Sequence, residues 1–244
     1  MNTSIKSPKQ TCSNEEQTDS FKKVVIYGGN GFVGTHVAKA LLEKGVCTAC
    51  LSRSGYKPLH LKNEKWSESV RWCKGDSLKP DMSLLKRVSG LICLVGSAPT
   101  PTTSDEAFNA QVIANGETNE KAIKAAGEAG IKRIVLIGAR LPFFLNNDRF
   151  GYAKGKRIAI QAAKEFSELS PDHRAIVLQP GMIFGKRFLK NGKSLPLGKL
   201  FKPLSYLMPW QFISVEKVAE RVALEMVCEN HEKEQFIILK NSEI

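Results

Sequence analysis

Tyr152 and Lys156 are the two residues in this chain of 244 whose types and spacing best suit chemistry. They lie in the run Gly151-Tyr-Ala-Lys-Gly-Lys156, where a helical pattern begins that continues toward Phe166. Residues four apart project from one face of a helix. Because an ammonium group beside a phenol stabilises the phenolate, we expect Lys156 to lower the pKa of Tyr152. Tyr152 would then donate or accept a proton near neutral pH.

A glycine cluster joins the first predicted strand to the first predicted helix. The apolar run 24–27 is followed by Gly28-Gly29-Asn30-Gly31-Phe32-Val33-Gly34, and the helical pattern after it ends at Gly45. Such a turn lets the backbone approach a pyrophosphate, and the helix offers free N–H groups and its positive dipole end. The glycine spacing is GxxGxxG rather than the GxGxxG of dehydrogenases, and a plain strand-to-helix turn is the alternative. The context favours a bound dinucleotide.

The second predicted strand, 46–51, leads into the loop Ser52-Arg53-Ser54-Gly55. This loop faces the adenosine ribose in dinucleotide-binding folds. An acidic residue there suits the ribose 2′-hydroxyl of NAD, whereas an arginine suits a 2′-phosphate. Because the acid is absent and Arg53 is present, the sequence favours NADP(H) over NAD(H). A solvated arginine without a ligand is the alternative.

Two further positions follow the next predicted strands. The strand 69–74 leads to Asp76, which could bond the adenine amino group or instead serve as a capping or turn acid. A helix over 81–88 and a strand over 91–95 come next. Gly96 and Ser97 follow this strand. They begin the segment that ends the first half of the fold, beside the expected cofactor.

The alternation of strands and helices predicts an α/β fold with a doubly wound parallel sheet covered on both faces. The remaining predicted elements are a helix over 105–130, strands over 131–137 and 174–179, a helix over 215–227 and a strand over 235–240. We expect one domain: a disordered leader over 1–20, a Rossmann-like NAD(P)-binding part over 21–180, and a lid, helix and last strand over 181–244 that complete it.

The net charge of +12 suits a basic soluble protein or one that binds anionic lipid or another polyanion. No apolar run reaches the roughly 20 residues that span a bilayer. Nucleic acid is not an expected partner, because no helix-turn-helix or aromatic-basic RNA-binding signature is present. The six cysteines are scattered, which predicts reduced thiols. Cys47 and Cys50 would point to opposite faces of a strand, so no metal site is expected.

Between His173 and Val215 the chain has no acidic residue, and basic residues alternate with apolar ones. This segment could cap an apolar substrate or lie on an anionic membrane surface, and a lid packed on the core is the alternative. Glu15, Glu16 and Asp19 argue against a standard mitochondrial transit peptide.

Four runs together resemble the atypical short-chain dehydrogenase/reductases: 27–34, 51–55, 151–157 and 179–181. The resemblance extends from Lys23 to the C-terminus. Within that group the chain is similar to small NAD(P)-binding proteins of mitochondria and plastids, including a fungal protein associated with coenzyme Q assembly. More distantly it is similar to the NADPH-binding accessory subunit of respiratory complex I.

The resemblance implies a Rossmann-like sheet with the cofactor over the three glycines and a ribose contact from Arg53. It also implies that Tyr152 and Lys156 face the nicotinamide. A mitochondrial location on the matrix side follows, with plastid or cytoplasm as alternatives. The residues expected to contact the cofactor are Gly28, Gly29, Asn30, Gly31, Phe32, Val33, Gly34, Ser52, Arg53, Asp76, Gly96, Ser97, Tyr152, Lys156, Pro180 and Gly181.

One position departs from the pattern of active members, which carry a serine or threonine just after the fifth strand. Here that stretch reads Ile137-Gly138-Ala139-Arg140. Three hypotheses therefore stand: an NADP(H)-dependent oxidoreductase or isomerase acting on an apolar, quinone-related molecule, a non-catalytic NADPH-binding subunit of a membrane-associated quinone or complex I assembly, and a redox sensor. Tyr152 and Lys156 favour the first, and the missing hydroxyl favours the second.

Overall fold

Seven strands form the central sheet of the computed structural model, which describes residues 23–189, 192–195, 211–228 and 234–244. The strand order is β11-β6-β5-β4-β1-β2-β3, and every neighbouring pair is parallel. The strands are β1 (Lys23–Tyr27), β2 (Cys47–Ser52), β3 (Arg71–Lys74), β4 (Gly90–Cys93), β5 (Arg133–Ile137), β6 (Arg174–Gln179) and β11 (Phe236–Lys240). This is the predicted Rossmann-like α/β fold.

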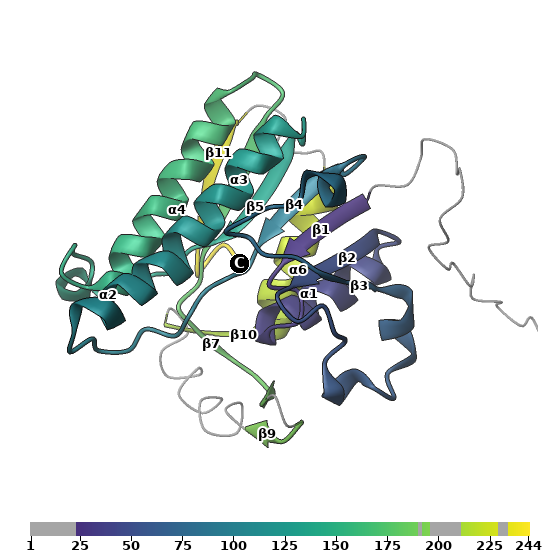
Figure 1. Ribbon diagram of the computed structural model, residues 1–244, viewed down its shortest axis with the longest axis horizontal. Helices are drawn as coiled ribbons and strands as arrows, with labels where there is room; N and C mark the ends of the chain where they lie inside the picture. The colour runs from purple at the N-terminus through teal and green to yellow at the C-terminus, as the bar shows by residue number, and fades with distance from the viewer. Residues whose placement is uncertain (1–22, 190–191, 196–210, 229–233) are drawn as a thin grey trace, which may run out of the picture.

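Helices cover both faces of the sheet (Figure 1). One face carries α2 (Asp105–Val112), α3 (Thr118–Glu128) and α4 (Gly151–Glu168), and the other carries α1 (Phe32–Glu43) and α6 (Val215–Val227). Side chains alternate along β1: Val25 and Tyr27 join the core under α3 and α4, whereas Val24 and Ile26 join the core under α1 and α6. The central strand β1 is therefore apolar on both faces, as expected for a parallel sheet.

The end of α1 shows how the sequence sets an element boundary. Gly45 takes a φ of +73°, a left-handed conformation that suits glycine, and its N–H donates to the carbonyl oxygen of Leu42 at 2.9 Å. Val46 then donates to Leu41 at 3.0 Å and leads into β2. The helix therefore ends where the sequence predicts.

Two predicted helices differ from the structure. The helix expected over 81–88 is only a 3₁₀ turn, η3 (Met82–Leu85), because Arg87 takes a φ of 55° that a right-handed helix does not accommodate. The helix expected over 105–130 contains a π-turn, η4 (Ile113–Glu117), between α2 and α3. An extra residue enters the helical ladder there, which periodicity alone does not reveal.

Short elements complete the described chain. They are the 3₁₀ turns η1 (Leu59–Leu61), η2 (Lys65–Ser69) and η5 (Phe143–Leu145), the parallel pair β7 (Met182–Phe184) with β10 (Phe212–Ser214), and the hairpin of β8 (Arg187–Phe188) with β9 (Ser194–Leu195). The expected leader over 1–20 and the lid residues 196–210 lie outside the described residues. In the part of the chain that the structure describes, no helix is long and apolar enough to cross a membrane.

Among the described cysteines, Cys50, Cys73, Cys93 and Cys228 are free thiols. Cys47 is disulfide-bonded, so the prediction of reduced thiols is wrong for that residue. Within the described ranges, no group of three or more potential metal ligands occurs.

Candidate cofactor site

The glycine turn packs tightly between β1, β2 and β4. Gly28 has a φ of +82°, and a Cβ built on it would lie 2.9 Å from the carbonyl carbon of Leu94. A Cβ on Gly29 would lie 2.5 Å from the Cβ of Cys50, and one on Gly34 would lie 2.7 Å from the Cα of Gly29. These three glycines let the first turn of α1 approach the ends of the strands.

Gly31 has a different role, because it is less crowded than Gly28, Gly29 and Gly34. It is the N-cap of α1 with extended backbone (φ −79°, ψ 177°), and among the described residues a built Cβ would meet only the carbonyl oxygen of Gly28, at 3.1 Å. In the described chain no side chain caps the helix, and no acidic residue lies in its first turn, which begins with Phe32 and Val33. An uncapped helix N-terminus of this kind fits the pyrophosphate of a dinucleotide.

The loop after β2 is held against this turn by side-chain hydrogen bonds. Asn30 Nδ2 donates to Ser54 Oγ at 3.2 Å, and the Ser52 and Ser54 hydroxyls lie 3.3 Å apart. The Gly55 N–H also donates to Ser52 Oγ at 3.1 Å. Arg53 is exposed on this loop and forms no ion pair within residues 23–189 and the other described ranges. The guanidinium is therefore accessible to an external anion beside the glycine turn.

Tyr152 and Lys156 lie on one face of α4, as their spacing predicts. Lys156 is only 8% exposed, and its Nζ donates to the carbonyl oxygen of Ile137, at the end of β5, at 2.8 Å. The same nitrogen lies 5.7 Å from the centroid of the Tyr152 ring, which is a cation–π distance. The ammonium therefore faces the ring of the tyrosine, while its hydrogen bond goes to the sheet.

Burial sets the pKa values of both groups. It lowers the pKa of Lys156 to about 8, an effect that the nearby Cys93 thiol partly offsets. It raises the pKa of Tyr152 to about 12. The expected lowering of the pKa of Tyr152 is therefore wrong, because removal of the phenol from water raises this pKa instead. Tyr152 is a phenol at neutral pH and suits the role of proton donor.

Small residues bring α4 close to the neighbouring helices. A Cβ on Gly151 would lie 2.7 Å from the carbonyl oxygen of Phe108 in α2, and one on Gly155 would lie 3.0 Å from the Cβ of Asn115 in η4. A Cβ on Gly116 would in turn lie 2.9 Å from the Cα of Gly155. Helices that lack these side chains approach more closely, and this contact directs Tyr152 and Lys156 toward the end of the sheet.

Three buried amides spaced four apart hold the loop after β4. Gln111 Nε2 donates to the carbonyl oxygen of Thr100 at 2.7 Å, and Asn119 Nδ2 donates to that of Val95 at 3.0 Å. Asn115, fully buried between them, accepts from Ser97 N at 3.2 Å and donates to Ser97 Oγ at 2.9 Å. We call these three residues the amide ladder. They fix the segment 95–100 beside Lys156, since a Cβ on Gly96 would lie 3.8 Å from Lys156 Nζ.

The amide ladder is the part of the site that sequence reasoning missed. Its signal is present in the sequence as polar residues at 111, 115 and 119 on the face of a helix that is otherwise apolar and small. That face points toward the core, so these amides need partners in the protein. The loop after β4 supplies acceptors for the three amide nitrogens and a donor for the Asn115 oxygen, whereas the side-chain oxygens of Gln111 and Asn119 have no hydrogen-bond partner within the described residues.

The remaining predicted residues lie at the same edge of the sheet, with different partners. Pro180 is buried after β6, and its carbonyl oxygen accepts from Arg140 N at 3.0 Å. Gly181 donates to Asn241 Oδ1 at 2.8 Å, and a Cβ on it would overlap the carbonyl oxygen of Gln211. Gly181 is therefore fixed by the C-terminal part of the chain, and Pro180 by the segment that follows β5.

Asp76 follows the edge strand β3. Its Oδ1 accepts from Leu78 N at 3.0 Å, so the turn role that the sequence left open is present. The contact with adenine stays a prediction. The stretch 137–140, where the resemblance leads us to expect a serine or threonine, has none, and the Gly138 N–H donates to the carbonyl oxygen of Leu178 at 2.7 Å.

Comparison with known proteins supports the fold and identifies a family. Residues 24–202 match the family described as the NAD dependent epimerase/dehydratase family. An uncharacterized chloroplastic protein of Arabidopsis thaliana is 33% identical over 189 residues, which cover 75% of this chain and 57% of the relative. The photosystem II assembly factor Ycf39 of Synechocystis is 29% identical over 116 residues, covering 46% and 32%. The chain thus spans about half the length of its first relative and less of Ycf39.

Two solved structures share the fold at low sequence identity. A short-chain dehydrogenase/reductase from Burkholderia thailandensis has a TM-score of 0.68 and 18% identity, covering 90% of each chain. UDP-glucuronic acid 4-epimerase from Bacillus cereus, solved in complex with NAD, has a TM-score of 0.65 and 13% identity, covering 89% of this chain and 77% of the epimerase.

Proposed function

The chain belongs to the NAD-dependent epimerase/dehydratase family, and we propose that it binds NADP(H) and reduces an apolar, quinone-related carbonyl compound with Tyr152 as proton donor. The observation that carries this proposal is the pairing of Tyr152 with the buried Lys156 at the edge of the sheet where the glycine turn opens. In open α/β sheets, ligands bind outside the carboxyl ends of the strands where the strand order reverses. Here that point lies between β4 and β1.

The cofactor would rest on the N-terminus of α1. The N–H groups of the first turn would bind the pyrophosphate, and the missing side chain at Gly31 would let it approach them. The nicotinamide supplies a hydride when bound. Tyr152, with a pKa of about 12, would hold the proton that the developing alkoxide needs, and Lys156 would orient the nicotinamide ribose.

The preference for NADP(H) rests on Arg53. Its exposed guanidinium lies on a loop that Asn30 ties to the glycine turn through Ser54. A guanidinium binds a phosphate in a bidentate manner, and no acidic residue stands in this loop to bind a ribose hydroxyl. The solved epimerase holds NAD, so the phosphate preference is a property proposed for this chain's own loop.

The proposals of an apolar substrate and of an organelle rest on the composition of one segment and on one relative. The basic and apolar segment between His173 and Val215 suits a cap over an apolar molecule or contact with an anionic membrane, and much of it lies outside the described residues. A chloroplastic relative supports an organelle as the site of action. We propose a mitochondrion, with a plastid as the alternative.

A second function is favoured by Ala139. Without a hydroxyl here, a substrate carbonyl would have one hydrogen-bond donor fewer. Bound NADP(H) could then stabilise the fold without reacting. A ligand that binds only the folded state stabilises it even when it does not react. A relative named as an assembly factor agrees with such an accessory role.

Replacement of Tyr152 by phenylalanine separates the two functions. We expect calorimetry to give the same affinity for NADPH in wild type and Tyr152→Phe, because the ring and its contact with Lys156 are kept. Under the enzymatic proposal, NADPH oxidation with a short-chain quinone falls by about 100-fold or more in the variant. If NADPH binds but the wild type shows no turnover that depends on Tyr152, the accessory role replaces the enzymatic one. If NADPH does not bind, both fail.

A further inference from the structure

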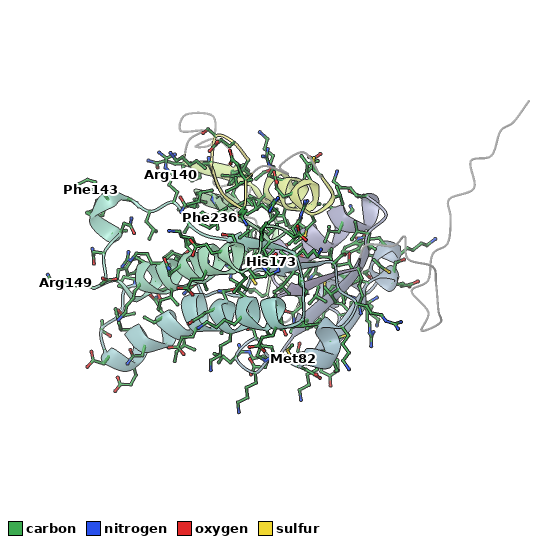
Figure 2. All side chains as sticks on the ribbon, turned by 90° about the horizontal axis from the view of Figure 1, so that it is seen from above. Met82, Arg140, Phe143, Arg149, His173 and Phe236 are labelled. Carbon is green, nitrogen blue, oxygen red and sulfur yellow. The ribbon has the colours of Figure 1, made fainter. Side chains whose placement is uncertain are left out.

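The loop between β5 and α4 carries an apolar tip that faces solvent. Its 3₁₀ turn, Phe143–Leu145, leaves Phe143 91% exposed and Phe144 62% exposed. Figure 2 shows Phe143 projecting from one end of the molecule. Neighbouring large apolar side chains in water usually mark a surface that meets another apolar phase or partner.

Local hydrogen bonds hold this tip in shape. The N–H groups of Leu145 and Asn146 donate to the carbonyl oxygen of Pro142 at 3.0 and 3.1 Å, and Asn147 Nδ2 donates to that of Phe144 at 2.7 Å. The two phenylalanine rings meet edge to face with centroids 5.7 Å apart. The rings are therefore presented outward by an ordered turn.

The surroundings of the tip are basic. Apart from the buried Lys156, the segment 139–157 has four basic residues, Arg140, Arg149, Lys154 and Arg157, and one acidic residue, Asp148, which pairs with Arg157. Arg140 and Arg149 are exposed on either side of the tip, and Figure 2 shows Arg149 projecting at the same end as Phe143. Aromatic rings flanked by guanidinium groups match an anionic bilayer surface, where rings enter the headgroup boundary and arginines bind lipid phosphates.

We propose that the tip Phe143–Leu145, with Arg140 and Arg149, docks this protein on an anionic lipid bilayer. The charge of the surrounding segment favours lipid phosphates over a neutral apolar partner. Docking by the tip would also bring the nearby start of α4 toward the membrane. The ring of Phe150, the residue before α4, lies 5.9 Å from the ring of Tyr152. That last step rests on the proposed function, because it would give an apolar substrate a short path from the bilayer to Tyr152. The docking itself does not depend on cofactor or turnover.

The test is sedimentation of the whole protein with vesicles of phosphatidylcholine and phosphatidylglycerol, compared with pure phosphatidylcholine. We expect binding to the mixed vesicles only. The double variant Phe143→Ser/Phe144→Ser should bind them at least about tenfold more weakly, because two apolar side chains no longer leave water. Phe143→Leu/Phe144→Leu should bind nearly as wild type, since a bilayer requires apolar surface rather than a particular ring shape.

Leu169→Ser is the matched control. Leu169 is 63% exposed, close to the value for Phe144, and it follows the other end of α4. It should leave vesicle binding unchanged, and all variants should keep the wild-type melting temperature. Equal binding by wild type and the serine double variant would overturn the proposal, as would loss of binding in the leucine double variant. A wild-type dimer that the serine variant converts to a monomer would assign the tip to a second copy instead. If the wild type binds the mixed vesicles but shows no NADPH turnover, the proposed enzymatic function is overturned and the docking proposal stands.

Discussion

Lys156 Nζ lies 2.8 Å from the carbonyl oxygen of Ile137, so a lysine from α4 is bonded to the end of the strand that precedes the missing hydroxyl. The bond crosses from a helix to the sheet within a buried site, where the ammonium has little water around it. This environment lowers the pKa of Lys156 to about 8. The lysine therefore loses its charge near pH 8, where the folded protein can be studied.

The buried lysine should make stability rise with pH. The unfolded chain holds this proton up to a pKa near 10.5, whereas the folded chain releases it near 8, so the unfolded state binds more protons between these values. We expect the unfolding free energy of wild type to gain up to about 3 kcal/mol relative to Lys156→Met across this window. Urea unfolding at several pH values measures the difference. Titrating groups that do not interact with Lys156 cancel between the two proteins, whereas Cys93 is coupled to Lys156 and belongs to the measured difference. A difference that does not change with pH would contradict the assignment.

Two glycines of the same turn should respond differently to substitution. A Cβ at Gly34 would lie 2.7 Å from the Cα of Gly29, so Gly34→Ala should lose about 1–3 kcal/mol of stability. Gly31 has extended backbone and one close contact, the carbonyl oxygen of Gly28 at 3.1 Å from a built Cβ, so Gly31→Val should lose less stability than Gly34→Ala. Its side chain would occupy the position of the pyrophosphate and weaken NADPH at least about tenfold. Calorimetry and thermal melting separate the two effects. Wild-type affinity in Gly31→Val would show that no diphosphate binds there.

Arg53 should decide between the two nicotinamide cofactors. We expect Arg53→Ala to weaken NADPH by about 10–100-fold, the usual range for loss of a hydrogen bond between charged groups, and to leave NADH within about twofold. Lys44→Ala is the control, since this exposed lysine follows the far end of α1. Titration of both nucleotides into the three proteins provides the check. If Arg53→Ala weakened the two nucleotides equally, the guanidinium would bind some other part of the cofactor.

Much of this site follows from local sequence patterns. Apolar runs and Gly45 mark the first strand and helix because a left-handed residue and a buried face leave clear signals in the chain. The four-residue spacing of Tyr152 and Lys156 likewise predicts their shared face. Tertiary environment decides the rest. The pKa of Tyr152 depends on how much water packing removes, and the short turn at 82–85 depends on the backbone of Arg87. Neither property is encoded in spacing.

The contacts of the amide ladder also depend on tertiary structure and could not be predicted from spacing. They lead to the last prediction. Asn115 is fully buried and binds both the N–H and the hydroxyl of Ser97, so it holds the loop after β4 against η4. Asn115→Leu removes these bonds, and the N–H of Ser97 then lacks its partner. We expect a loss of about 1–3 kcal/mol in unfolding free energy. Hydrogen exchange should quicken in segment 95–100 before the rest of the sheet opens.

A control variant separates this effect from general damage to the core. Ser97→Ala removes the hydroxyl but keeps the bond from Ser97 N to Asn115 Oδ1, so it should be milder on both measurements. Because segment 95–100 lies against Lys156, a loosened loop should also weaken NADPH, and added NADPH should restore part of the protection in Asn115→Leu. Protection that stays at the wild-type level without NADPH would show that the loop is held by its own backbone, and the ladder would then be a packing feature of the helix alone.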